Sequence, residues 1–152
     1  DDEFLESNDL DWFSCYGDGS LAHFATGGSC IIPSEIRESI NNYEVTYDYF
    51  NSLSVTSNME IIENNIPLFL TEEKRTRYLQ SFINMAAKGL YSYDIRRDDG
   101  SYKLIARPIF PLTREQLPQE VESIIYTLPA EIASGTLIVS KVEWCSTLIG
   151  WE

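Results

Sequence analysis

The sequence is poor in the residues on which most catalytic and cofactor sites depend. It has one histidine, His23, and its three cysteines stand in no paired metal-ligand spacing. These cysteines are Cys15, Cys30 and Cys145. No phosphate-binding loop is present, because Gly17-Asp18-Gly19 lacks the later glycine and Thr26-Gly27-Gly28-Ser29 lacks a lysine. The sequence therefore predicts no cofactor and no nucleotide site.

The sequence also lacks long apolar runs. Its longest nearly uncharged stretches, such as Thr136-Leu137-Ile138-Val139, are far shorter than the ~18 residues of a membrane-spanning helix. The first residues, Asp1-Asp2-Glu3, are the reverse of the basic segment that opens a secretory signal, although a leader already removed would leave no trace. We therefore predict a cytoplasmic protein with no membrane partner. Its cysteines are expected to be buried and reduced, and the pairing of Cys15 with Cys30 is left open.

Positive charge is scarce, above all in the first fifty residues. The chain has 24 acids against 11 bases and a net charge of −13. The first fifty residues hold eleven of the acids and a single base, Arg37, so they carry −10 of that charge. Nucleic acids and anionic membranes are poor partners, because both bind through clustered Lys and Arg. The charge favours a basic protein partner attracted by an acidic face, or it serves solubility alone.

Length and pattern predict one α+β domain over residues 1–152, with an antiparallel sheet built from hairpins. Turn chemistry at Gly17-Asp18-Gly19 predicts a hairpin from Trp12 to Phe24, and Asp98-Asp99-Gly100 predicts a second one. Further strands are expected near residues 59–62 and 136–144.

Two longer helices and one short helix are expected. The first should run from about Glu35 to Leu53 with Ser34 as its cap, and the second should start at the cap Thr71 and end at Gly89. The short helix is expected from Leu117 to Leu128.

A catalytic site would have to be built around His23, with Ser14, Cys15 or Ser20 as the nearby nucleophile. His23 lies between apolar neighbours on an expected strand, where a structural histidine is the commoner outcome. A small enzyme with a cleft near His23 is therefore the alternative function, beside a structural or regulatory module that self-associates.

Three acids near the start of the chain could suggest a metal site. They are Asp9, Asp11 and Asp18. A calcium loop needs acids at alternating positions, a glycine at the sixth and a glutamate at the twelfth, whereas Trp12 and Phe13 interrupt this run. A capped turn accounts for Asp9 and Asp11, so we predict no metal.

The most distinctive run is Asp9-Leu10-Asp11-Trp12-Phe13, followed by Leu21-Ala22-His23-Phe24 and Thr26-Gly27-Gly28. It resembles the opening of small acidic bacterial immunity proteins of contact-dependent or polymorphic toxin systems. The resemblance covers mainly residues 9–36, with looser similarity at Ala106-Arg107-Pro108-Ile109. It implies a cytoplasmic, non-enzymatic protein that covers the basic cleft of a toxin domain, commonly a nuclease, with acidic side chains. It carries over no catalytic residue.

The leading hypothesis is therefore an inhibitor that binds a basic toxin domain through an acidic face. The aromatic residues of the first hairpin are more often core and edge residues than a binding platform, but a ring that projects beside Asp11 or Asp18 could act as an interface anchor. These aromatic residues are Trp12, Phe13, Tyr16 and Phe24. The residues predicted to bind the partner are Asp9, Asp11, Trp12, Asp18, Glu35, Glu38, Glu44 and Asp48. Neither the partner's identity nor the oligomeric state follows from the sequence.

Overall fold

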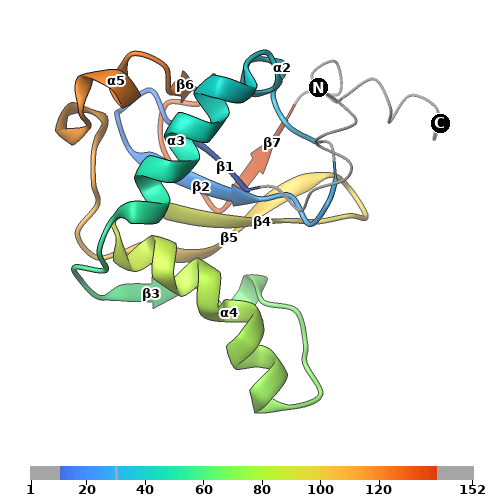
Figure 1. The fold of residues 1–152 in the computed structure, drawn as a ribbon. Helices are drawn as coiled ribbons and strands as arrows, with labels where there is room; N and C mark the ends of the chain where they lie inside the picture. Colours follow the sequence, from blue (N-terminus) through green and yellow to red (C-terminus); the bar gives the residue numbers. More distant parts are fainter. Residues whose placement is uncertain (1–10, 30, 140–152) are drawn as a thin grey trace.

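The computed structural model describes residues 11–29 and 31–139, and within them the chain is an α+β domain (Figure 1). The strands are β1 (Asp11–Cys15), β2 (Leu21–Ala25), β3 (Met59–Ile61), β4 (Tyr91–Ile95), β5 (Ser101–Pro108), β6 (Tyr126–Thr127) and β7 (Thr136–Ile138). The helices are α2 (Ser34–Arg37), α3 (Ile40–Ser52), α4 (Glu72–Ala87) and α5 (Gln119–Glu122), with short 3-10 turns η1 (Glu63–Asn65) and η2 (Arg114–Gln116). The predicted fold class is confirmed.

The sheet has the order β3-β5-β4-β2-β1-β6, and β7 also pairs with β5. Both predicted hairpins are present, β1 with β2 and β4 with β5. The expectation of a purely antiparallel sheet is wrong, because β2 pairs parallel with β4 and β1 pairs parallel with β6. Parallel neighbours need a long crossover connection, and the chain between β2 and β4 supplies one that contains α3 and α4.

The first expected helix is interrupted. Ser39 has an extended backbone with φ −140° and its hydroxyl accepts a hydrogen bond from the Asn42 amide, so it caps α3 and separates it from α2. Ser34 lies inside α2 and makes no N-terminal cap; its hydroxyl instead donates to Glu35. At the other end of α3, the Lys88 ammonium donates to the carbonyls of Phe50 and Asn51.

The second helix follows the prediction closely. The Thr71 hydroxyl accepts a hydrogen bond from the Lys74 amide at 3.1 Å and caps α4. Gly89 follows the helix with φ +110°, and a Cβ added there would lie 2.7 Å from the backbone nitrogen of Leu112. Only glycine fits this position, because both the backbone angle and the neighbouring chain exclude a side chain.

The expected helix from Leu117 to Leu128 is mostly absent. Only α5 is helical, and the chain then extends into β6, where Ser14 and Cys15 pair with Tyr126 and Thr127. Pairing with the exposed edge of β1 satisfies backbone groups that a longer helix would leave unpaired at that edge. The last expected strand is present as β7, and residues 140–144 lie outside the described residues.

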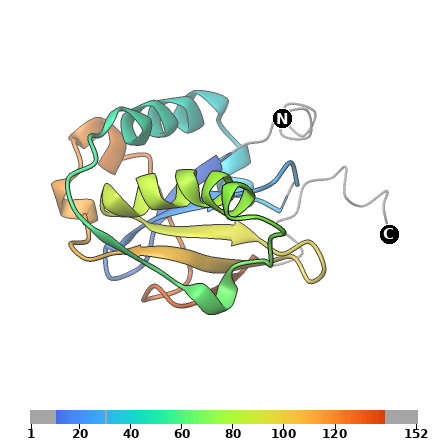
Figure 2. The same ribbon diagram turned by 90° about the horizontal axis from the view of Figure 1, so that it is seen from below.

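The two long helices cover one face of the sheet. Helix α3 packs over β1, whereas α4 packs over β3, β4 and β5 (Figure 2). Phe13, Cys15 and Leu21 face the α3 side, together with Phe50 and Met85. The alternation of side chains along β1 and β2 sends Trp12 and Phe24 to the opposite face.

The opposite face is a fully buried aromatic layer. Its residues include Trp12, Phe24, Tyr93 and Tyr102 of the strands, and Tyr16 directly after β1. The segments around Ile31-Ile32 and from Leu128 to Val139 close over it. Among the described residues no helix is both long and apolar enough to cross a bilayer.

Candidate functional site

The residues predicted to bind a partner do not form one patch. Asp9 lies outside the described residues. Asp18 lies in the β1–β2 turn, where its carboxylate accepts a hydrogen bond from the Ser20 amide at 2.9 Å. Together with Arg114 and Glu122, it lines a shallow depression. Asp11, whose side chain is 30% exposed, and Trp12, which is buried, belong to two separate hydrogen-bond networks. The other four acids are all exposed: Glu35 lies in α2, Glu38 follows its last residue, and Glu44 and Asp48 lie in α3.

Trp12 is completely buried, so the prediction that it contacts a partner directly is wrong for this structure. Its ring stacks on Phe24 with centroids 4.1 Å apart. The indole nitrogen donates to the Tyr102 hydroxyl at 3.1 Å, and that hydroxyl donates to the Ile31 carbonyl at 2.6 Å. Alternation along β1 explains this placement, because Trp12 takes the aromatic face while its neighbour Phe13 takes the helix face.

Asp11, His23 and Ser92 form a hydrogen-bonded chain across β1, β2 and β4. His23 Nε2 lies 2.8 Å from Asp11 Oδ2, and His23 Nδ1 lies 2.7 Å from Ser92 Oγ. In the neutral imidazole the carboxylate fixes the proton on Nε2, so the Ser92 hydroxyl donates to Nδ1. The residue types and their order are those of a serine hydrolase triad, in which the histidine acts as the base, but the ring nitrogens are exchanged: in that triad Nε2 faces the serine and Nδ1 the carboxylate.

The buried position of His23 and Ser92 prevents a substrate from reaching them in the present conformation. Both His23 and Ser92 have 0% exposure, and the imidazole packs against Phe13 and Phe82 with centroids 5.4 and 6.1 Å away. A nucleophile must reach a substrate carbonyl, and Ser92 reaches only His23. The arrangement thus acts within the fold, as a polar link that joins three strands beneath α3 and α4.

Sequence reasoning missed Ser92. It placed the nucleophile close to His23 along the chain, at Ser14, Cys15 or Ser20, because the parallel pairing of β2 with β4 was not foreseen. That pairing sets His23 opposite Ser92. Cys15 is a free, buried thiol whose sulfur lies 3.3 Å from the Thr127 hydroxyl, whereas Cys30 and Cys145 lie outside the described residues.

A second polar pair, Tyr78 and Asp94, lies beside the hydrogen-bonded set of Asp11, His23 and Ser92. The Tyr78 hydroxyl donates to Asp94 Oδ2 at 2.6 Å, and the Ile95 amide donates to Asp94 Oδ1. Burial raises the pKa of Asp94, and the two hydrogen bonds and the charge of Arg96 oppose this only in part. Burial, together with the bond to this carboxylate, also raises the pKa of Tyr78.

The pKa of Asp94 predicts a pH-dependent effect of Asp94→Asn. An acid whose pKa is raised by folding adds stability below its unfolded pKa, and this is lost as pH rises through the folded pKa. The free energy of unfolding of the wild type relative to Asp94→Asn should therefore be largest near pH 4 and fall toward pH 7, as urea titrations can measure.

The exposed Asp99 offers the opposite control. Hydrogen bonds from the Ser101 amide and hydroxyl lower the pKa of Asp99. The advantage of the wild type over Asp99→Asn should therefore be fully present above the unfolded pKa and shrink as pH falls below it through the folded pKa. A difference between wild type and Asp94→Asn that grew in the same direction would contradict the assignment of Asp94.

The α2–α3 acidic face consists of Glu35, Glu38, Glu44 and Asp48, all of them exposed. Helix α3 contains no Lys or Arg, and Glu44 and Asp48 share one face because they are four residues apart. Arg37 of α2 directs its Nε to the Ile32 carbonyl at 3.2 Å. The face is therefore strongly negative on the surface of the helical layer.

Elsewhere, arginines and glutamates compensate each other. Arg75 pairs with Glu63 at 2.6 Å and Arg77 with Glu73 at 3.0 Å. Similar pairs join Arg107 to Glu60 and Arg114 to Glu122. Both arginines of the base-rich helix α4 are thus paired with acids.

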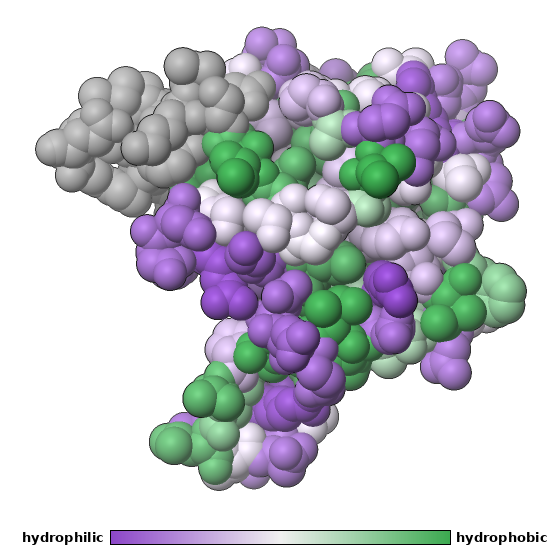
Figure 3. All heavy atoms as spheres, turned by 180° about the vertical axis from the view of Figure 1, so that it is seen from behind, coloured by the Kyte–Doolittle hydropathy of each residue, from purple (hydrophilic) through white to green (hydrophobic). Residues whose placement is uncertain are grey.

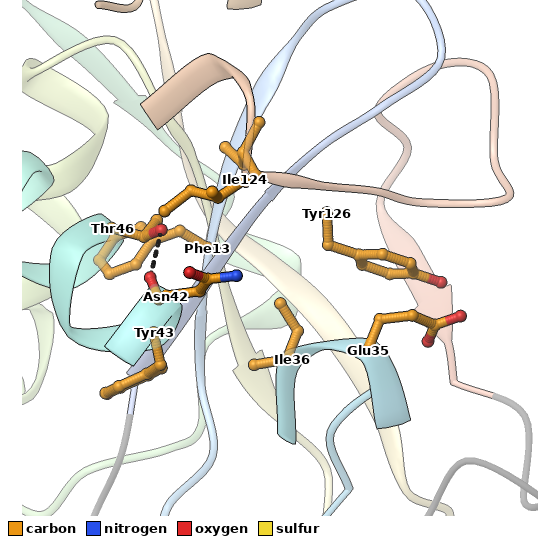
Figure 4. Close-up of a pocket in the computed structure, with 9 residues that line it drawn as sticks. Phe13, Glu35, Ile36, Asn42, Tyr43, Thr46, Ile124 and Tyr126 are labelled. Carbon is orange, nitrogen blue, oxygen red and sulfur yellow. Dashed lines mark hydrogen bonds between the residues drawn. The ribbon is translucent and has the colours of Figure 1, made fainter. Parts of the chain in front are cut away.

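A pocket of about 170 Å³ opens beside the acidic face, between α2, α3, β1 and the segment that leads into β6 (Figure 4). Its walls are mainly apolar, from Phe13, Ile36, Ile124 and Ile125, with the ring of Tyr126 at one end. The polar groups at the pocket are those of Glu35, Asn42, Tyr43 and Thr46. No signal in the sequence identified this pocket, because its walls come from four separate segments.

Exposed apolar side chains are concentrated away from the pocket. Leu68 and Leu70, in the loop before α4, are 102% and 92% exposed. Figure 3 shows hydrophobic side chains at the end of the part of the molecule that projects from the body. Phe110 is also 73% exposed. Residues 11–29 and 31–139 contain no group of three or more His, Cys, Asp or Glu able to hold a metal ion.

Comparison of the chain with protein-family models, with curated proteins and with solved structures finds no match, so the geometry alone bears on function.

Proposed function

We propose that this protein is a non-enzymatic inhibitor of the immunity type, which binds a basic protein domain through the α2–α3 acidic face. The partner would be a toxin domain, such as a nuclease whose active-site cleft is basic. The observation that carries the proposal is the distribution of charge: among the described residues the acids of α3 form no ion pair, whereas arginines on α4 and β5 are paired with glutamates.

Charge placed in this way favours fast encounter. A concentrated acidic surface attracts a basic partner over a distance of about 8–10 Å at physiological salt and raises the association rate by 10- to 1000-fold. Acids scattered for solubility would need no such concentration on one helix pair. The adjoining apolar pocket adds a concave element of the kind that holds an anchor residue in tight interfaces.

The test is a pair of charge-matched variants. Glu44→Lys with Asp48→Lys reverses two charges on the acidic face, and Glu72→Lys with Glu115→Lys reverses two exposed acids elsewhere. The partner is first captured with the tagged wild type from a lysate of the source organism at low salt. The variant on α3 should then associate about tenfold or more slowly with it, whereas the control should change little.

Stopped-flow association at several salt concentrations measures this effect. The salt dependence should weaken in the α3 variant, and thermal unfolding should be nearly unchanged in both variants because the residues are exposed. Equal slowing by the two variants would mean that net charge alone drives association, and the acidic face would lose its role.

A further inference from the structure

The pocket between α2, α3 and β6 has the shape and chemistry of a site for one side chain. We propose that it receives an arginine of the basic partner, with the stem of the arginine against the apolar walls and the guanidinium at Glu35. This inference rests on the proposed function and specifies which contact would anchor the complex. It concerns the pocket itself, whereas the acidic face acts at longer range.

The walls suit a long, unbranched stem. Ile36 and Ile124 lie on opposite sides of the pocket in Figure 4. Phe13 and Ile125 also line it, and both side chains are nearly completely buried. Arg and Lys both bury their methylene groups against such surfaces while the charged head stays near water. A purely apolar side chain would use these walls too, but it would displace water from a carboxylate without replacing its hydrogen bonds.

The polar groups at the pocket are divided between those already bonded and those open to a ligand. The Thr46 hydroxyl donates to the Asn42 carbonyl at 2.9 Å, and the Tyr43 hydroxyl donates to the Asp11 carbonyl at 2.6 Å. The Asn42 side-chain amide makes no hydrogen bond to another described residue, and Glu35 accepts only from Ser34 at 3.2 Å among these residues. Glu35 and Asn42 therefore provide acceptors for a donor-rich ligand.

The same end of the pocket favours arginine over lysine. In Figure 4 the ring of Tyr126 and the carboxylate of Glu35 lie side by side at one end of the pocket. A planar guanidinium can stack on an aromatic ring while its edge donates two hydrogen bonds to a carboxylate, whereas an ammonium is a point charge. Arginine is also among the residues most enriched at the energetic centres of interfaces.

A second copy of this chain is a poor source of that arginine. All seven arginines fall within the described residues, and each is already bonded in its own chain. Four form the ion pairs with glutamates, and three donate to the backbone carbonyls of Ile32, Asn65 and Gly27. A different, basic protein is therefore the occupant to which the pocket points.

The test uses short peptides, so it does not depend on knowing the partner. Acetyl-Gly-Arg-Gly-amide is titrated into the labelled full chain and followed by two-dimensional amide NMR. The same peptide with citrulline, which keeps the shape and loses the charge, and the same peptide with lysine serve as comparisons. The arginine peptide should shift the Asn42 side-chain amide and the backbone amides of residues 35–36, 42–46 and 124–126, with at least about tenfold weaker binding of citrulline.

Variants separate the pocket from general attraction. Glu35→Gln should weaken the arginine peptide about threefold to tenfold, because it removes the charged acceptor. Asp48→Asn removes the same charge from α3 outside the pocket and should change the affinity less than twofold. Tyr126→Leu should reduce the preference for arginine over lysine. If Tyr126→Leu fails to fold, Asn42→Ala, which removes the other open acceptor, should weaken binding of the arginine peptide.

Two results would overturn the inference. One is the absence of shifts at the pocket in the presence of millimolar peptide, and the other is equal weakening by Glu35→Gln and Asp48→Asn, which indicates diffuse attraction only. Failure of the arginine pocket can be distinguished from failure of the proposed function. A protein partner sensitive to Glu44→Lys with Asp48→Lys but not to Glu35→Gln would retain the inhibitor and reject the arginine pocket.

Discussion

Trp12→Ala is expected to lower the free energy of unfolding by about 3–5 kcal/mol, the largest loss that we anticipate from a single substitution. The indole is completely buried, stacks on Phe24 and meets Tyr102 edge-on with centroids 5.6 Å apart. Truncation leaves a cavity in the centre of the aromatic layer, and close packing on both sides restricts its collapse. It also removes the hydrogen bond to the Tyr102 hydroxyl.

Urea unfolding of three variants separates packing from hydrogen bonding. Tyr102→Phe keeps the ring but leaves the Trp12 indole nitrogen and the Ile31 carbonyl without their partner, and it should cost about 1–3 kcal/mol. Leu68→Ala, at a fully exposed side chain, should cost less than about 0.5 kcal/mol. A loss below about 1 kcal/mol for Trp12→Ala would show that the aromatic layer contributes little to stability.

The elements that the sequence predicted are those set by local chemistry. Thr71 caps α4 and Gly89 ends it, because both act on backbone groups within a few residues. The two hairpins depend on their own turns in the same way. Ser39 also forms a local cap, at the start of α3. The sequence did not predict this cap, because the apolar stripe of the single helix expected from Glu35 to Leu53 continues across Ser39.

The elements that were not predicted depend on contacts distant in the sequence. The parallel pairing of β2 with β4 brings Ser92 to His23 across 69 positions, and no turn or cap marks that encounter. The pocket likewise combines Phe13, Ile36 and Tyr126 from separate segments. Trp12 is predicted to contact the partner only as an aromatic ring that projects beside an acid, and the alternation along β1 instead directs it into the buried aromatic layer.

His23→Gln should lower the free energy of unfolding by about 2–4 kcal/mol. The imidazole has 0% exposure and bridges Asp11 to Ser92 through both ring nitrogens, a span that a glutamine amide does not match. The substitution leaves the Ser92 hydroxyl without its acceptor in a buried position, which costs about 1–3 kcal/mol, and it disturbs the packing of Phe13 and Phe82.

A double-mutant cycle between His23→Gln and Asp11→Asn measures whether the two residues act as a unit. The loss in free energy of unfolding in the double variant should be smaller than the sum of the losses in the two single variants by about 0.5–3 kcal/mol, because either change breaks the same bond. Strict additivity would contradict a shared link.

The His23→Gln variant also distinguishes the inhibitor function from a hydrolase function. If His23 were the base of an active site, His23→Gln would abolish turnover of an ester substrate under conditions in which the variant remains folded. With His23 and Ser92 enclosed beneath two helices, we expect neither the wild type nor the variant to turn over p-nitrophenyl acetate above the rate without protein. We expect the variant, below its unfolding midpoint, to keep any affinity for a basic partner, because the α2–α3 acidic face lies outside this buried link.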